Sequence, residues 1–243
     1  MKDSVKRICL WSGPRNISTA LMYSFAQRHD TTVYDEPLYG YYLQHLPPAR
    51  EYHPGADEVI NTMETDGQKV VDMMMGEHHT PVVFFKHMTH HLLGLDRSFM
   101  KDVVNVILTR DPVEMLPSYG KLVTDPTMQD VGYAAHMQLL DDLHNMNVEP
   151  IVVDSKKILL DPEGTLTRLC ELAGIPFDKN MLHWQAGARP EEGVWARYWY
   201  SNVRQSTGFA PYAPKTGPFP ERLKPLLKDC LPHYHKLREM SIG

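Results

Sequence analysis

The sequence contains few cysteines. Only three occur among 243 residues, Cys9, Cys170 and Cys230, which are too few and too scattered for a disulfide framework. Cys9 and Cys170 lie in apolar runs, where a buried free thiol is expected. We therefore expect a protein of a reducing compartment, the cytoplasm.

Long apolar runs and a surplus of positive charge are also missing. No stretch of 18 apolar residues occurs, and the segment MKDSVKRICLW passes into the first apolar run without the core of a signal peptide. The formal net charge is -5, whereas proteins that bind nucleic acids or acidic membranes usually carry a basic surplus. We expect a soluble protein that binds neither, so any anion site must be local.

What the sequence does contain is an alternation of short apolar runs with helical patterns. With 42% hydrophobic residues, we expect residues 1–243 to form a single domain. Buried strands are predicted at 7–11, 31–36, 81–87, 103–109 and 149–154. Helices are predicted at 18–28, 56–76, 95–101, 112–122, 129–146 and 161–174. This order predicts an α/β fold of three layers, a parallel sheet covered by helices on both sides.

The segment from about 185 to 220 has weak periodicity and is rich in Gly, Pro and aromatic residues. Long loops without regular structure are often functional, so we interpret it as a segment that covers a site rather than a plain surface connection. Its aromatic residues either line a pocket or pack the segment onto the sheet; they are Trp195, Tyr198, Trp199 and Tyr200.

The stretch LWSGPRNISTALMYSF, residues 10–25, predicts a strand, a tight turn and a helix. The free N–H groups of a helix N-terminus attract anions, and Arg15 stands just before this one. The turn does not match the nucleotide triphosphate loop G-x-x-x-x-G-K-[ST], because Ser18 and Thr19 stand where that loop has its second glycine and its lysine. An ordinary ATPase or kinase is therefore disfavoured.

Charged residues follow the predicted strands, where α/β proteins bind their ligands. The residues at these positions are Gly13, Pro14, Arg15, Asn16, Asp35, Glu36, Lys86, His87, Arg110 and Asp154. A site that holds a polyanion and moves a proton needs both cations and carboxylates, as found here.

Three stretches resemble the sulfotransferases that use 3′-phosphoadenosine-5′-phosphosulfate (PAPS). GPRNISTAL is similar to their phosphosulfate loop P-[KR]-S-G-[ST]-T, with Asn16 and Ile17 in place of the usual serine and glycine. LTRDPVEMLPSYGKL is similar to their 3′-phosphate segment, with Arg110 and Ser118 at the binding positions. IVVDSKKILLDPEGTLTRLCELAGIPFD resembles the strand and helix that follow, and the likeness spans roughly residues 7 to 180.

The resemblance implies PAPS as donor, 3′-phosphoadenosine-5′-phosphate (PAP) as product, a small-molecule acceptor and no required metal. It implies two further groups of binding residues besides Arg110 and Ser118. They are the loop Gly13, Pro14, Arg15, Asn16, Ile17, Ser18 and Thr19, and the looser match STGF, Ser206, Thr207, Gly208 and Phe209.

The acceptor must lose a proton, which requires a base. Glu36, in VYDEPLYG, resembles the F-x-E-P-L segment of carbohydrate sulfotransferases, and His87, in FFKHM, stands one residue before the histidine position of the K-T-H segment in aryl enzymes. We favour Glu36 as the base and assign Lys86 to the sulfuryl group. Alternatively, Glu36 forms a structural ion pair with Arg15 or Lys86, and His87 is a core residue.

Two other functions stay open, a P-loop kinase or other nucleotide-dependent transferase and a non-catalytic nucleotide-binding protein. The histidine pairs in EHH (77–79) and THH (89–91) are interpreted as surface loops rather than metal ligands, because no Cys or spaced carboxylate completes a ligand set. The sequence predicts no oligomeric state and does not identify the acceptor.

Overall fold

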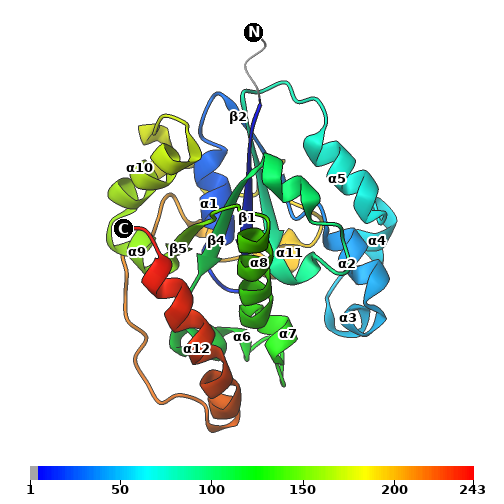
Figure 1. Ribbon diagram of the computed structural model, residues 1–243. Coiled ribbons are helices and arrows are strands. Elements are labelled where there is room, and N and C mark those ends of the chain that lie inside the picture. The colour runs from blue at the N-terminus through cyan, green and yellow to red at the C-terminus, as the bar shows by residue number, and fades with distance from the viewer. Residues whose placement is uncertain (1–4) are drawn as a thin grey trace.

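The computed structural model describes residues 5–243, and its centre is a five-stranded parallel sheet in the order β2-β3-β1-β4-β5 (Figure 1). The strands are β1 (Lys6–Ser12), β2 (Thr31–Asp35), β3 (Val82–Met88), β4 (Val104–Thr109) and β5 (Ile151–Asp154). All five predicted strands are present within two residues of their expected limits. The predicted α/β fold, a parallel sheet flanked by helices, is confirmed.

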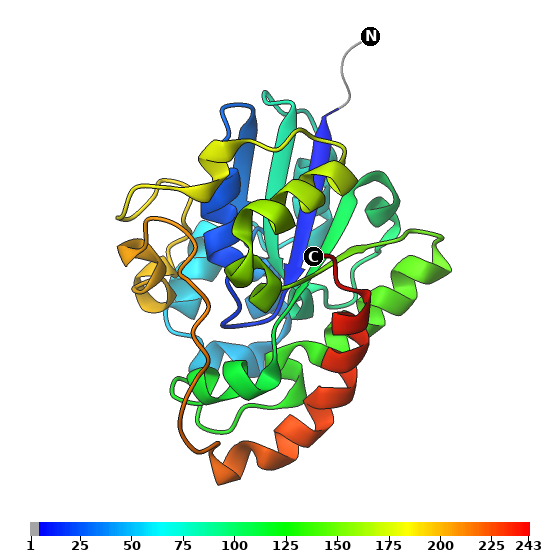
Figure 2. The ribbon, with the colours of Figure 1, turned by 90° about the vertical axis from the view of Figure 1, so that its left-hand side faces the viewer.

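Side chains of the central strand alternate between two cores, one on each face of the sheet. In β1, Ile8 and Leu10 belong to one core, whereas Cys9 and Trp11 belong to the other. Both faces are buried because helices cover each of them, which explains why the strands are apolar without alternation. Helices α1 (Ser18–Phe25) and α10 (Pro162–Ala173) supply the first core, and Figure 2 shows α10 lying across that face.

The second core is covered by α5 (Gly67–Met75), α8 (Tyr133–Asn145) and α12 (Lys224–Met240). Two helices that the sequence predicts as continuous are divided here. Residues 56–76 form α4 (Ala56–Thr62) and α5, because Asp66 caps a new helix with its carboxylate. Residues 129–146 form α7 (Met128–Val131) and α8, which meet at Gly132 with a left-handed φ of 78°.

Helix α6 (Pro112–Tyr119) confirms its prediction, whereas residues 95–101 contain only the 3₁₀ turn Ser98–Asp102. The sequence analysis missed several helices: α2 (Tyr39–His45), α3 (Pro47–Tyr52), α9 (Ser155–Leu160), the single turn α11 (Ala196–Trp199) and α12. Further 3₁₀ turns lie at Thr89–His91, Lys179–Leu182, Val203–Gln205 and Glu221–Leu223.

Helix α12 contains Pro232, and its buried positions are few, which weakens its sequence pattern. Its contacts with the rest of the fold are nonetheless specific. Leu237 is fully buried in the second core, and the Tyr234 hydroxyl donates to Asp154 Oδ2 at 2.9 Å, at the end of β5. Beyond the helix, Ile242 forms a bridge with Val153 of β5.

The three cysteines are buried and free, as predicted for Cys9 and Cys170. Within residues 5–243, no helix combines the length and the apolar character that crossing a bilayer requires.

The packing of α12 generates a stability prediction. Leu237→Ala should lower the free energy of unfolding by about 2 to 5 kcal/mol, because it opens a cavity in a closed core. Glu239→Ala, at an exposed position two residues further on, should change it by less than about 0.5 kcal/mol. Urea unfolding of both variants measures the difference, and equal values would contradict the docking of α12.

Candidate functional site

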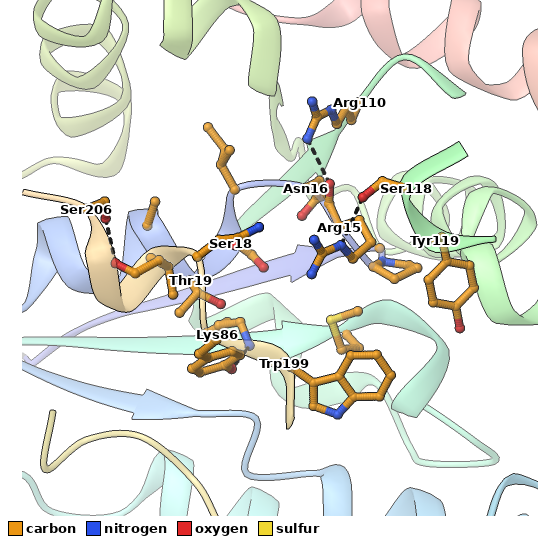
Figure 3. A pocket seen from close by; sticks show the side chains of 18 of the residues that line it. Arg15, Asn16, Ser18, Thr19, Lys86, Arg110, Ser118, Tyr119, Trp199 and Ser206 are labelled. Carbon is orange, nitrogen blue, oxygen red and sulfur yellow. Dashed lines mark hydrogen bonds between the residues drawn. The ribbon is translucent and has the colours of Figure 1, made fainter. Parts of the chain in front are cut away.

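A cavity of about 470 Å³ opens at the carboxyl ends of β1 to β4 (Figure 3). Its walls contain most of the residues singled out in the sequence, namely Gly13, Pro14, Arg15, Asn16, Ile17, Ser18, Thr19, Glu36, Lys86, Arg110, Ser118, Ser206, Gly208 and Phe209. Four of the residues singled out in the sequence do not line it, namely Asp35, His87, Asp154 and Thr207.

The loop after β1 is held in one shape by backbone and side-chain constraints. Arg15 adopts a left-handed φ of 55°, and a Cβ at Gly13 would lie 2.9 Å from the Val131 carbonyl oxygen. Asn16 is buried and its Nδ2 donates to the Leu108 carbonyl at 2.9 Å, which ties the loop to β4. The asparagine that departs from the resembled motif therefore has a structural role.

Helix α1 begins directly after this loop, and no side chain caps it. Its N-cap residue is Ile17, and its first turn carries no acidic residue. The Ser18 N–H donates to the Asn16 carbonyl, and the other N–H groups of that turn lack a side-chain acceptor. Ser18, Thr19 and Ala20 line the cavity, so the positive end of the helix dipole lies at its wall. This is a suitable environment for an anion.

Two arginines meet at this helix end, as Figure 3 shows. Arg15 Nε donates to Ser118 Oγ at 3.3 Å, and Arg110 Nη1 donates to the Arg15 carbonyl at 2.9 Å. Arg110 also pairs with Glu114 at 3.3 Å, and its Nε is buried without a hydrogen-bond partner in the described part of the chain. Burial and the neighbouring Arg110 lower the pKa of Arg15.

A third cation, Lys215, was not singled out from the sequence; it is exposed and does not line the cavity. Burial and the charges of Arg110 and Arg15 lower the pKa of Lys215. Lys215 lies in the irregular segment with no motif around it, so only the folded chain brings it here. The three cations repel one another, and a bound polyanion would relieve this repulsion.

On the other side of the loop, Lys86 is enclosed by three oxygen acceptors. The Lys86 ammonium donates to Asp35 Oδ1 at 2.9 Å, to the Tyr200 hydroxyl at 2.7 Å and to Glu36 Oε1. Lys86 is 1% exposed. Burial opposes its charge, but the carboxylates of Asp35 and Glu36 outweigh this effect and hold the pKa of Lys86 well above its usual value.

Glu36 lines the cavity in a constrained backbone conformation. Its φ is 46°, and its N–H donates to the Lys86 carbonyl at 2.8 Å, so it turns out of β2 before Pro37. Burial raises the pKa of the Glu36 carboxyl, Lys86 lowers it and Asp35 raises it again. The net effect is a raised pKa of Glu36. The structure pairs Glu36 with Lys86 rather than with Arg15.

His87 lies on the opposite face of β3 from Lys86, because successive side chains of a strand alternate. It is fully buried and stacks on Trp11 with ring centroids 4.4 Å apart. Burial, aided by the Lys86 charge, lowers the pKa of His87 to about 3. The structure therefore places His87 in the second core, as the alternative reading of this residue expected, and not at the cavity.

Aromatic and imidazole rings form the wall beyond Glu36. Tyr39 stacks on His91 with centroids 5.0 Å apart, packs edge-on against Trp195 at 5.1 Å, and its hydroxyl is 2.6 Å from His53 Nδ1. Burial lowers the pKa of His53 to about 4 and that of His90 to about 3, so the imidazoles are neutral at pH 7.

This wall corrects the prediction that the THH segment is a surface loop, because Thr89 and His91 are buried. The EHH segment at 77–79 does lie at the surface. In the part of the chain that the structure describes, no group of three His, Cys, Asp or Glu residues is arranged to hold a metal ion.

The irregular segment supplies much of the remaining wall. Trp195, Trp199 and Tyr200 line the cavity, whereas Tyr198 is 43% exposed and does not. In the STGF stretch, Ser206, Gly208 and Phe209 line it, whereas Thr207 contributes its carbonyl to the Trp184 N–H at 3.1 Å. A Cβ at Gly208 would lie 2.8 Å from the Leu182 carbonyl oxygen, so the glycine permits this close approach.

Known proteins similar to this chain fall into two groups. Two Arabidopsis thaliana proteins, branched-chain-amino-acid aminotransferase-like proteins 2 and 1, are 40% identical to this chain over 230 residues and 43% identical over 232 residues, respectively. Each match covers 94% of this chain, but only 40% and 41% of the relatives. The chain thus spans about two fifths of the length of the curated relatives it matches.

The second group consists of solved structures. A sulfotransferase from Alicyclobacillus acidocaldarius aligns with a TM-score of 0.57 at 15% identity, covering 97% of this chain and 96% of its own. The sulfotransferase domain of the Synechococcus PCC 7002 olefin synthase aligns with a TM-score of 0.52 at 15% identity, covering 94% and 95%. At this identity the likeness shows the fold alone.

A protein-family model described as a sulfotransferase domain matches residues 6–241, nearly the whole chain. Its extent includes the loop after β1, the arginine after β4 and the irregular segment that lines part of the cavity. The chain belongs to the sulfotransferase domain family.

Proposed function

We propose that the protein transfers a sulfuryl group from PAPS to a hydroxyl or amine of a small acceptor and releases PAP. One observation carries this proposal: Arg15, Arg110 and Ser118 meet at the uncapped N-terminus of α1, in the cavity that also contains Glu36 and Lys86. Anion binding and proton removal are thereby available within one cavity.

The donor end of the cavity suits a molecule with two separate anionic groups. Arg110 and Ser118 offer a guanidinium and a hydroxyl to a 3′-phosphate, and Arg110 Nε is a buried donor without a partner in residues 5–243. Arg15 and the first-turn amides of α1 suit the 5′-phosphosulfate. Asn16 Oδ1 is also buried without a partner among these residues, so it can accept a hydrogen bond from the part of PAPS that lies near this loop.

When bound, the donor supplies an activated sulfuryl group with a phosphate leaving group. Arg15 and the α1 amides stabilise the negative charge that develops as the sulfur–oxygen bond breaks. Glu36 takes the proton of the acceptor, which its upward-shifted pKa favours because a stronger base removes a proton more readily. The aromatic wall with Tyr39, Trp195 and Trp199 positions the acceptor.

We further propose that residues 1–243 act as one domain in which the segment 185–220 covers the bound molecules. The Tyr23 hydroxyl of α1 donates to Glu192, and Arg204 pairs with the same carboxylate. These contacts anchor the segment to the helix whose N-terminus faces the cavity.

Nucleotide preference gives the first test of this function. PAP should bind much more tightly than AMP or ADP in calorimetry, because only PAP carries the 3′-phosphate. Arg110→Ala should weaken PAP binding about 30- to 150-fold, equivalent to roughly 2 to 3 kcal/mol for a charged hydrogen bond. ADP binding should change little, and Lys236→Ala, at an exposed position of α12, should alter neither. Equal affinities of the parent protein for PAP and ADP would overturn the assignment of the donor.

Arg15 should affect turnover more than nucleotide binding, because its partner charge grows as the sulfuryl group leaves. In Arg15→Ala we expect kcat to fall on the order of 10²- to 10³-fold, with a much smaller change in the Kd of PAP. Arg15→Asn should behave alike, since asparagine tolerates the left-handed backbone. EDTA should leave the parent rate unchanged; a loss restored by magnesium would instead favour the kinase.

Glu36→Gln should fold and bind PAP but lose about 100-fold or more in kcat, the usual scale for a positioned base. The parent rate should fall as the pH drops through the raised pKa of Glu36, because the base must be ionised. His87→Asn serves as the comparison, with a much smaller effect on kcat. An acceptor found with labelled PAPS in a metabolite extract makes the assay possible, and parental activity in Glu36→Gln would overturn the role of Glu36 as the base.

A further inference from the structure

We propose that Asp35 and Tyr200 are positioning residues that hold Lys86 in a closed set of hydrogen bonds, and that Lys86 in turn holds Glu36 as the base. The inference rests on the proposed function, because it concerns the same proton transfer. No motif in the sequence assigns a role to Asp35 or Tyr200. Lys86, which the sequence analysis assigned to the sulfuryl group, here acts on Glu36 instead.

The ammonium of Lys86 has no free hydrogen-bond donor. A lysine ammonium has three N–H groups, and Lys86 directs them to three different oxygens, on Asp35, Glu36 and Tyr200. No N–H remains for a sulfuryl oxygen unless one of these partners leaves. Lys86 therefore acts on Glu36, and Arg15 with the α1 amides remains to contact the transferred group.

The single proton of the Tyr200 hydroxyl fixes the direction of its hydrogen bonds. It accepts from Lys86 at 2.7 Å and from Trp195 Nε1 at 3.3 Å, so its proton goes to Asp35, whose two oxygens are both 2.9 Å away. With both acceptor sites and the donor used, the hydroxyl is fully bonded. Its ring is buried, with 5% exposed.

Lys86 and its partners come from two neighbouring strands and from the irregular segment. Asp35 ends β2 and Lys86 lies in β3, next to it in the sheet, as the register pairs the two residues directly. Tyr200 comes from the irregular segment, and the Gly193 N–H of the same segment donates to Asp35 Oδ2 at 3.2 Å. Asp35 thus binds the covering segment through two residues, Gly193 and Tyr200. The hydrogen bonds around Lys86 are complete only when this segment is in place.

Lys86 shares its positive charge between the carboxylates of Asp35 and Glu36. One ammonium faces two carboxylates, so Glu36 receives only part of the attraction of Lys86. The charge of Asp35 favours protonation of Glu36, against the opposing charge of Lys86. Without Asp35, Lys86 would pair with Glu36 alone and make it a weaker base.

A matched pair of tyrosine variants tests the positioning. Tyr200→Phe removes one hydroxyl from the buried set, whereas Tyr198→Phe removes one from an exposed ring of the same segment that does not line the cavity. We expect kcat to fall about 10- to 100-fold in Tyr200→Phe, the scale of a displaced catalytic group, with KM for the acceptor and the Kd of PAP within a factor of three. Tyr198→Phe should retain parental kcat. Equal kcat values for the two variants would overturn the role of Tyr200.

A titration without donor or acceptor tests Asp35 independently of activity. The carboxyl of Glu36 is followed by ¹³C NMR in protein labelled at glutamate and assigned with Glu36→Gln. In Asp35→Asn the midpoint of Glu36 should move to lower pH by about 1 to 3 units, because a neighbouring negative charge is lost. An unchanged midpoint or a move to higher pH would overturn the inference. This test does not depend on the Tyr200→Phe variant, so it holds even if that variant is unstable. Absence of sulfuryl transfer in the parent would overturn the proposed function, while the titration would still report on Asp35.

Discussion

Parallel pairing of β1 with β3 on one side and β4 on the other is the constraint on which the site depends. It places the carboxyl ends of these strands at one edge, with the loop after β1 in the centre. Arg110 then follows β4 on one side of the loop, and Lys86 lies near the carboxyl end of β3 on the other side. The apolar side chains of both cores stabilise this pairing, so the charged residues at the carboxyl edge of the sheet are held by rigid strands.

The two sides of the loop balance charge in opposite ways. Around Arg15 and Arg110, positive charge exceeds the single nearby carboxylate of Glu114, which favours a polyanion. Around Lys86, two carboxylates surround one ammonium, and burial together with the charge of Asp35 raises the pKa of Glu36 against the opposing charge of Lys86. A cavity with an anion-binding end and a basic end fits a reaction that transfers an anionic group to an acceptor that loses a proton.

The predictable part of the molecule is the part encoded locally. Apolar runs predicted all five strands, and Asp66 and Gly132 show why two helices were predicted too long: one cap and one left-handed glycine divide them. Helix α12 was missed because its docking depends on a few buried side chains such as Leu237. His87 shows the limit of a motif displaced by one residue, since a strand turns successive side chains to opposite faces.

The sequence by itself determined the order of strands and helices, the loop at the N-terminus of α1 and the placement of Arg110 and Glu36 near it, because each follows from neighbouring residues. Only the tertiary structure decided which partners these groups meet. Tyr200 lies 165 residues from Asp35 along the chain yet shares a hydrogen bond with it, and Lys215 joins the arginines from a segment without a motif. Such contacts arise from packing between distant segments, and no local pattern records them.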